Sequence, residues 1–149
     1  MAILIETVKT LMARDLAKLR AELNAYPSDD AIWKLDGSIK NTAGNLCLHI
    51  CGNLQHYIGK QLGNSSYVRH REAEFSSKGL SREALIKEVE ATAQIVDSVL
   101  SALPISQIEN VYPEMVFDKP MTTGYFLIHL AGHLNYHLGQ INYHRRLLN

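Results

Sequence analysis

Four long stretches of the chain carry apolar residues at the three-or-four spacing of an α-helix, and this periodicity restricts the fold more than any other feature. We expect helices over residues 3–26, 41–62, 81–103 and 122–148. In each stretch the apolar side chains form one face, and most charged side chains lie away from it. Because such helices bury their apolar faces against one another, the sequence predicts an all-α protein built as a four-helix bundle.

The ends of these helices are marked by residues that cap or stop a helix. Asn41 or Thr42 can cap the second helix through a side-chain oxygen, and Ser81 can cap the third. Pro27 and Pro104 follow the first and third helices, which proline cannot continue. We therefore expect two long connections, over residues 63–80 and 105–121, and connections of this length often carry function.

The size and charge of the chain limit the classes of protein to which it can belong. Its 149 residues suit one domain, which we place over residues 1–149. Fifteen Lys and Arg residues balance fifteen Asp and Glu residues, which argues against a strongly basic nucleic-acid-binding protein. No stretch approaches the roughly 18 apolar residues of a membrane-spanning helix. The two cysteines, Cys47 and Cys51, cannot build a disulfide framework, so we expect a cytoplasmic protein with small, buried thiols.

Histidines are concentrated in the fourth predicted helix. Four of the seven, His129, His133, His137 and His144, lie within sixteen consecutive residues. Residues four apart on a helix stand one turn above each other, so His129, His133 and His137 form a ladder. Two adjacent members of the ladder can bind one metal ion, but the first and last are about 12 Å apart along the helix. Spacing alone therefore leaves two pairs open, and both contain His133.

A third metal ligand has to come from another helix of the bundle. The second predicted helix offers His49 and, two turns later, His56, and His49 lies deeper in the apolar pattern. Three histidines leave one tetrahedral position open for water or substrate, whereas structural zinc sites usually have four protein ligands. An ion with three neutral ligands acidifies a bound water or deprotonates a bound thiol. The pattern thus favours a metal site that activates a bound water or thiol over a purely structural metal site.

Three segments resemble the DinB/YfiT-like superfamily of metalloenzymes. Residues 133–141, HLNYHLGQI, are similar to the signature of the last helix in that family, and residues 45–54, NLCLHICGNL, to its second-helix motif with a single histidine. Residues 69–75, RHREAEF, resemble a loop that follows the second helix in one branch. The resemblance implies a four-helix bundle in which His49, His133 and His137 hold one divalent metal ion per chain, with zinc or nickel as the expected metals.

The resemblance also implies roles for neighbouring residues. His129, Asn53 and Gln140 would lie behind the ligands or line the pocket. From charge alone, and not from the resemblance, Arg69, Arg71 or Arg145 could bind a carboxylate of the thiol or substrate. Family members of known activity are thiol-dependent enzymes, and many form homodimers. We therefore expect an S-transferase that joins a low-molecular-weight thiol to an electrophilic small molecule, without a nucleic-acid or membrane partner. The alternatives are a metal-dependent hydrolase with the same ligands, or a bundle that binds a metal or small ligand without catalysis.

Overall fold

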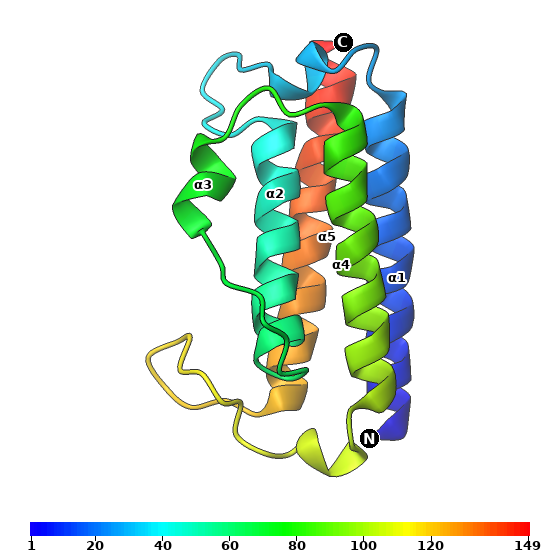
Figure 1. Cartoon of the computed structure of the whole chain (residues 1–149), viewed down its shortest axis with the longest axis vertical. Coiled ribbons are helices and arrows are strands. Elements are labelled where there is room, and N and C mark those ends of the chain that lie inside the picture. Colours follow the sequence, from blue (N-terminus) through cyan, green and yellow to red (C-terminus); the bar gives the residue numbers. More distant parts are fainter.

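The computed structural model describes residues 1–149, and it is built from helices and loops without a strand. Four long helices form a bundle: α1 (Ala2–Ala25), α2 (Ala43–Leu54), α4 (Arg82–Ala102) and α5 (Thr123–Leu148). A fifth, short helix, α3 (Arg71–Ser76), lies outside the bundle against α2 (Figure 1). The all-α expectation is confirmed, but the chain has five helices rather than four, because part of the connection over residues 63–80 is helical.

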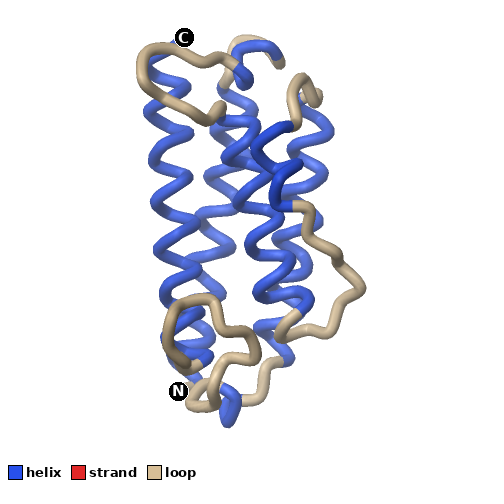
Figure 2. The backbone as a smooth tube through the Cα atoms, turned by 90° about the vertical axis from the view of Figure 1, so that its left-hand side faces the viewer, coloured by secondary structure: helices blue, strands red, loops and turns tan.

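The long helices run up, down, down and up in chain order (Figure 1). α1 packs against α4 and α5, and α2 packs against the same two helices from the other side. Because α2 and α4 run in the same direction, the connection between them has to return along the length of the bundle, and α3 lies on this return path. Figure 2 shows the part of this segment that leads to α3 as a loop that passes outside the long helices.

Three of the four long helices begin with a side-chain cap. Side-chain oxygens of Thr42, Ser81 and Thr122 accept hydrogen bonds from the backbone N–H groups at the starts of α2, α4 and α5. α2 is followed directly by a π-helical turn over Gln55–Lys60, so helical structure continues close to the expected end at residue 62. Such turns widen the helix and often lie near functional sites.

α2 is the most enclosed helix of the molecule. Eleven of its twelve residues are buried, because α4 and α5 cover two sides and the return connection covers a third. Two glycines allow this close approach, since the ring of Trp33 lies against Gly44 and the carboxylate of Glu74 lies against Gly52. A polar side chain on α2 therefore has little access to water and needs partners within the protein.

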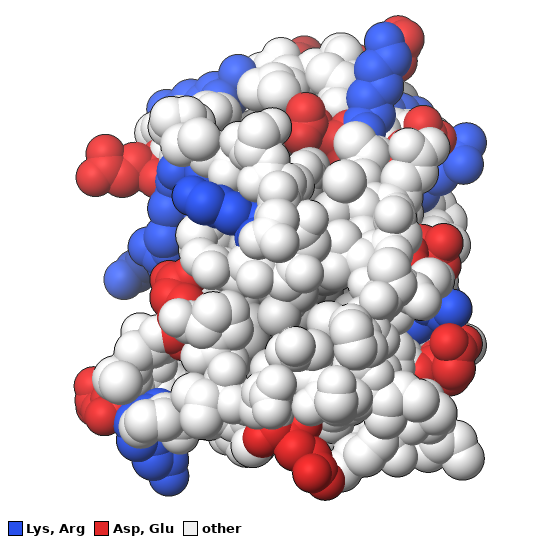
Figure 3. Space-filling model, turned by 60° about the horizontal axis from the view of Figure 1, so that its bottom comes forward, with Lys and Arg blue, Asp and Glu red and all other residues white.

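The surface of the bundle carries dispersed charges. In the view of Figure 3, most Lys, Arg, Asp and Glu side chains lie toward the edges and uncharged atoms cover most of the centre. None of the helices combines the length and apolar character needed to cross a membrane. Cys47 and Cys51 are buried free thiols on α2, as expected.

Candidate metal centre

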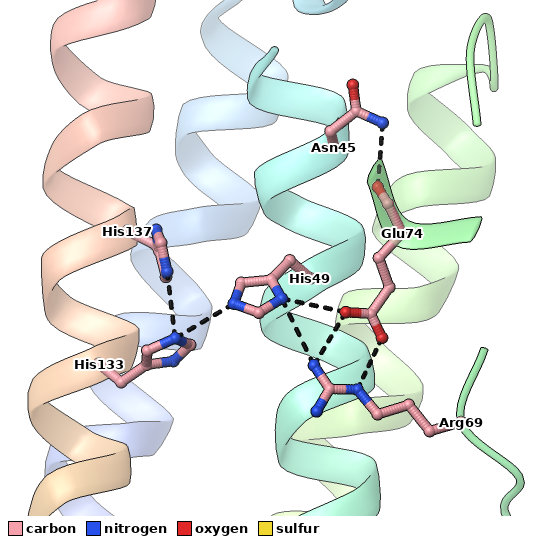
Figure 4. A network of polar contacts seen from close by, with 6 residues as sticks. All are labelled: Asn45, His49, Arg69, Glu74, His133 and His137. Carbon is pink, nitrogen blue, oxygen red and sulfur yellow. Dashed lines mark hydrogen bonds and ion pairs between the residues drawn. The ribbon is translucent and has the colours of Figure 1, made fainter. Parts of the chain in front are cut away.

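Three histidines from two helices meet between α2 and α5. Nε2 of His133 lies 3.1 Å from Nε2 of His49 and 3.1 Å from Nε2 of His137. All three nitrogens lie within 4.8 Å of one another (Figure 4). Of the two histidine pairs that spacing left open, the structure places the second, His133 and His137, against His49, so these three side chains can hold one metal ion.

The protonation of these rings fits a metal ion. Nδ1 of His49 lies 3.0 Å from a carboxylate oxygen of Glu74, and Nδ1 of His137 lies 2.6 Å from the amide oxygen of Gln140. Both Nδ1 atoms therefore donate, which leaves both Nε2 atoms as acceptors. Nε2 of His133 can donate a hydrogen bond to only one of these two Nε2 atoms, so the lone pair of the other has no donor. A divalent cation would satisfy all three nitrogens at once.

The spacing of the nitrogens supports the same conclusion. Ligands about 2.0–2.1 Å from a tetrahedral ion lie roughly 3.3 Å from one another. The two short Nε2–Nε2 separations of 3.1 Å are close to this value. Only small side-chain movements are needed for the three imidazoles to bind one ion.

Burial favours the neutral form of His133 and His137, which is the form that binds metal. Desolvation lowers the pKa of His133 to about 4, and the neighbouring His137 and His49 add to this effect. Desolvation also lowers the pKa of His137, although its hydrogen bond with Gln140 acts in the opposite direction. Both rings are therefore uncharged near neutral pH.

Glu74 on α3 orients His49 from behind. Its carboxylate also accepts two hydrogen bonds from Arg69, one from Nε and one from Nη2, each 2.9 Å long. Burial alone would raise the pKa of the Glu74 carboxyl, but the hydrogen bonds from His49 and Arg69 hold it below its usual value. The carboxylate is therefore charged and fixes His49 in the tautomer with a free Nε2.

Asn45 attaches α3 to α2 and so fixes the position of Glu74. Its side-chain amide donates to the backbone carbonyl of Glu74 at 2.9 Å and to that of Ser77 at 2.8 Å. Its own oxygen accepts a hydrogen bond from the Thr42 hydroxyl at 2.7 Å. Asn45 and His49 are one turn apart on the same face of α2 (Figure 4). This face therefore carries the candidate ligand His49 and also binds α3, whose Glu74 orients it.

A cavity of about 160 Å³ adjoins the histidines on the side facing the connection over residues 105–121. His49 and His133 form part of its wall. The other lining residues come from α2, the π-helical turn, α5 and both long connections: Asn53, Tyr57, Arg69, Arg71, Val116, Phe126, His129 and Leu130. The cavity gives a small molecule access to the candidate metal centre.

The remaining expected site residues lie around this centre. His129 lines the cavity and packs between the rings of Phe117 and Phe126, at centroid distances of 5.0 Å and 5.7 Å. Asn53 is buried in the cavity wall. Gln140 lies beside His137, on the side away from the cavity. Of the three arginines proposed for anion binding, Arg69 is paired with Glu74 and Arg145 with Glu22, whereas Arg71 has no carboxylate partner.

The other histidines have separate surroundings. His144 is buried and contacts the hydroxyl of Tyr26 at 2.7 Å and the carbonyl of Lys34 at 2.9 Å. His56 pairs with Glu114 at 2.7 Å, and next to it the Tyr112 hydroxyl donates to the carbonyl of Tyr57 at 2.6 Å. These contacts attach the connection over residues 105–121 to the π-helical turn. They do not bring His56 to the metal centre.

Sequence reasoning missed the partnership of Glu74 with His49. From the sequence, Glu74 was only a member of the RHREAEF segment and one of several acidic residues in the predicted loops. The available signal was the pair of Arg69 and Glu74 within that segment, because opposite charges so close in sequence can meet across a short loop. The contact of this pair with His49 depends on tertiary packing, which the spacing of residues along the sequence does not predict.

Comparisons with known proteins identify the family of the chain and agree with its fold. An all-helical bundle with three converging histidines defines a class of candidate metal-binding proteins. The sequence profile of the DinB superfamily matches residues 6–141, and the chain therefore belongs to the DinB superfamily. No match was found among curated proteins.

One solved structure has the same fold over nearly the whole chain. It is the crystal structure of a conserved protein from Enterococcus faecalis, with a TM-score of 0.77 and 14% sequence identity. The alignment covers 96% of this chain and 95% of that one. At this level of identity the likeness supports the fold alone.

Proposed function

We propose that this protein is a metal-dependent S-transferase that uses a low-molecular-weight thiol. The observation that carries the proposal is the convergence of three imidazoles, from His49, His133 and His137, beside a small cavity. A divalent ion held by three histidines keeps a position for a further ligand, and when bound it lowers the pKa of a thiol or water placed there. Zinc and nickel both suit imidazole ligands.

The residues of the chain contribute to this reaction by orientation and by control of protons. Glu74 and Gln140 hold the Nδ1–H groups of His49 and His137, so that both Nε2 atoms face the centre. During transfer the thiol sulfur forms a bond to an electrophilic carbon, the leaving group departs with its bonding electrons, and the thiol proton passes to water.

The first test is the metal content of protein prepared without a histidine tag. We expect about one divalent ion per native chain, and loss of the ion in His49→Gln, His133→Gln and His137→Gln. His56→Gln is the control, because His56 lies outside the cluster and pairs with Glu114. Circular dichroism shows whether each variant is folded. A native chain that binds no metal even after reconstitution would overturn the proposal.

The second test asks whether turnover requires a thiol. Metal-loaded protein is incubated with electrophilic substrates in the presence and absence of low-molecular-weight thiols, and product formation is followed by mass spectrometry. Thiol adducts support an S-transferase. Turnover that needs no thiol would identify the hydrolase alternative, and stable metal binding without any turnover would identify a non-catalytic binding protein.

A further inference from the structure

The cavity beside the histidines is too small for the two reactants of the proposed function. Its volume is about 160 Å³, whereas cavities that bind small organic ligands usually measure about 300–1,000 Å³. An S-transferase has to hold a thiol and an electrophile at the same time. The cavity has room for one small molecule but not for both reactants, so part of its wall has to move before the reaction.

Residues 113–120, in the connection between α4 and α5, cover one side of this cavity, and we call them the lid. In Figure 1 they belong to the yellow loop that extends sideways from the lower end of the bundle. Two backbone hydrogen bonds of 2.9 Å close the base of the loop, from Tyr112 to Met121 and from Thr123 to Asn110. Within the lid itself, no backbone group is hydrogen-bonded to another part of the backbone. The lid can therefore move on a fixed base.

Two apolar side chains of the lid contact the bundle at the cavity. Val116 lines the cavity, and the ring of Phe117 lies with its centroid 5.0 Å from that of His129 and 6.1 Å from that of Phe126. Both side chains are only partly buried, and Phe117 is 37% exposed. Lifting the lid would expose little additional apolar surface and would join the cavity to the solvent.

Glu114 is the only lid residue whose side chain is hydrogen-bonded to the bundle. Its Oε2 atom lies 2.7 Å from Nε2 of His56 and accepts a hydrogen bond of 2.9 Å from the side-chain amide of Gln61. His56 belongs to the π-helical turn, and Gln61 directly follows it. A single carboxylate therefore holds the lid against the end of α2.

The closed position of the lid leaves one polar atom unsatisfied. Nδ1 of His56 is buried without a hydrogen-bond partner, while Nε2 of the same ring contacts Glu114. A buried polar atom without a partner costs free energy. Release of Glu114 frees the ring to turn toward water, where both nitrogens find partners. This cost offsets part of the stabilisation that the two hydrogen bonds of Glu114 provide, and it favours a lid that opens readily.

We propose that residues 113–120 are a lid that Glu114 holds closed over the candidate metal centre and that opens to admit the reactants. The inference rests on the proposed function, because the two reactants of that function need the additional space. Val116 and Phe117 cover the cavity when the lid is closed. Closure of such a loop separates a reaction from water, and its opening often limits turnover.

Limited proteolysis measures the open lid without any ligand. Chymotrypsin cleaves after Phe117 only when this ring leaves the bundle, so the rate of that cleavage follows the open population. Glu114→Ala should raise the rate about tenfold or more, because hydrogen bonds to a charged group are lost, and Gln61→Leu should raise it less. Glu109→Ala is the control, because Glu109 is exposed in the same connection. Mass spectrometry identifies the fragment, and equal rates for Glu114→Ala and the native chain would overturn the lid.

The size of a thiol tests whether the lid controls entry. In cobalt-substituted protein, the absorption of the cobalt–thiolate bond reports thiol binding, and stopped-flow mixing gives its rate. 2-Mercaptoethanol is small enough for the closed cavity, whereas the tripeptide glutathione is not. Glu114→Ala should raise the binding rate of glutathione about tenfold and leave that of 2-mercaptoethanol unchanged. An equal effect on both thiols would contradict control of entry by the lid.

Proteolysis also separates this inference from the proposed function, because it needs neither metal nor thiol. A chain that binds no cobalt or no thiol, but whose cleavage after Phe117 depends on Glu114, would contradict the proposed function and retain the lid. A chain that binds both thiols at rates independent of Glu114 would contradict the lid alone.

Discussion

Nδ1 of His49 lies 3.0 Å from Oε1 of Glu74, so a ligand on α2 is oriented by a carboxylate from α3. This carboxylate is charged and doubly hydrogen-bonded to Arg69. A histidine whose Nδ1–H is held by a carboxylate is a more basic and better oriented ligand. The short helix in the return connection therefore belongs to the candidate metal centre, although it contributes no ligand.

Glu74→Gln should weaken metal binding without abolishing it. The amide oxygen can still accept from His49, but the negative charge and the ion pair with Arg69 are lost. Changes of this kind typically lower metal affinity about 10- to 100-fold. Zinc titration against a competing chelator measures the effect. Glu72→Gln is the control, because Glu72 is exposed on the same helix, and equal zinc affinity of the two variants would contradict the role of Glu74.

Gly52→Ala should damage the centre through Glu74. A methyl group at this position would overlap the carboxylate of Glu74, which lies directly against the glycine. Gly132→Ala is the matched control, because nothing lies within 4 Å of the added atom. Replacing a helical glycine by alanine in open space raises the free energy of unfolding by about 0.5–1 kcal/mol. We expect this gain for Gly132→Ala, and a loss of both zinc affinity and stability for Gly52→Ala. Unchanged zinc affinity in Gly52→Ala would be incompatible with this packing.

The metal-free protein should become less stable as the pH falls from about 6.5 to about 4. His133 has a pKa of about 4 in the folded chain, below the ordinary value of about 6.5. Between these values the unfolded chain binds the proton and the folded chain does not, so acidification favours unfolding. Urea denaturation of chelator-treated protein across this range measures the slope. His133→Gln should show a smaller slope, and an identical slope would contradict the assignment.

Tyr26→Phe should destabilise the fold and leave metal binding intact. The substitution removes the hydroxyl that contacts Nδ1 of His144 at 2.7 Å, and leaves that buried nitrogen without a partner. A loss of this kind lowers the free energy of unfolding by about 1–3 kcal/mol. Urea denaturation measures the loss, and zinc content reports the centre. A change in zinc content would show that His144 acts on the centre rather than on the fold alone.

The main features of the fold could be predicted because they depend on local patterns. Apolar periodicity located the four long helices, and the caps Thr42 and Ser81 marked two of their starts. α3 escaped prediction because its six residues are too few for a periodic signal, and it is held by the tertiary hydrogen bonds of Asn45.

In the site, too, some features follow from local sequence patterns and others depend on tertiary packing. Helical spacing placed His133 next to both His129 and His137, but could not select one pair. The choice depends on the height at which His49 meets α5, which is a property of helix packing. The contact of Glu74 with His49 follows from the same packing, whereas Gln140 lies three residues after His137 on α5, where helical spacing already places it beside that ligand.

His49 and His133 are 84 residues apart in the chain, and their Nε2 atoms are 3.1 Å apart in the fold. The whole return connection, all of α4 and the following connection lie between them. The cluster therefore does not exist until two distant parts of the chain have met, and folding that depends on such long-range contacts is slow. An ion that needs all three histidines has to enter after the bundle has assembled, and would then act as a cross-link that closes this long loop.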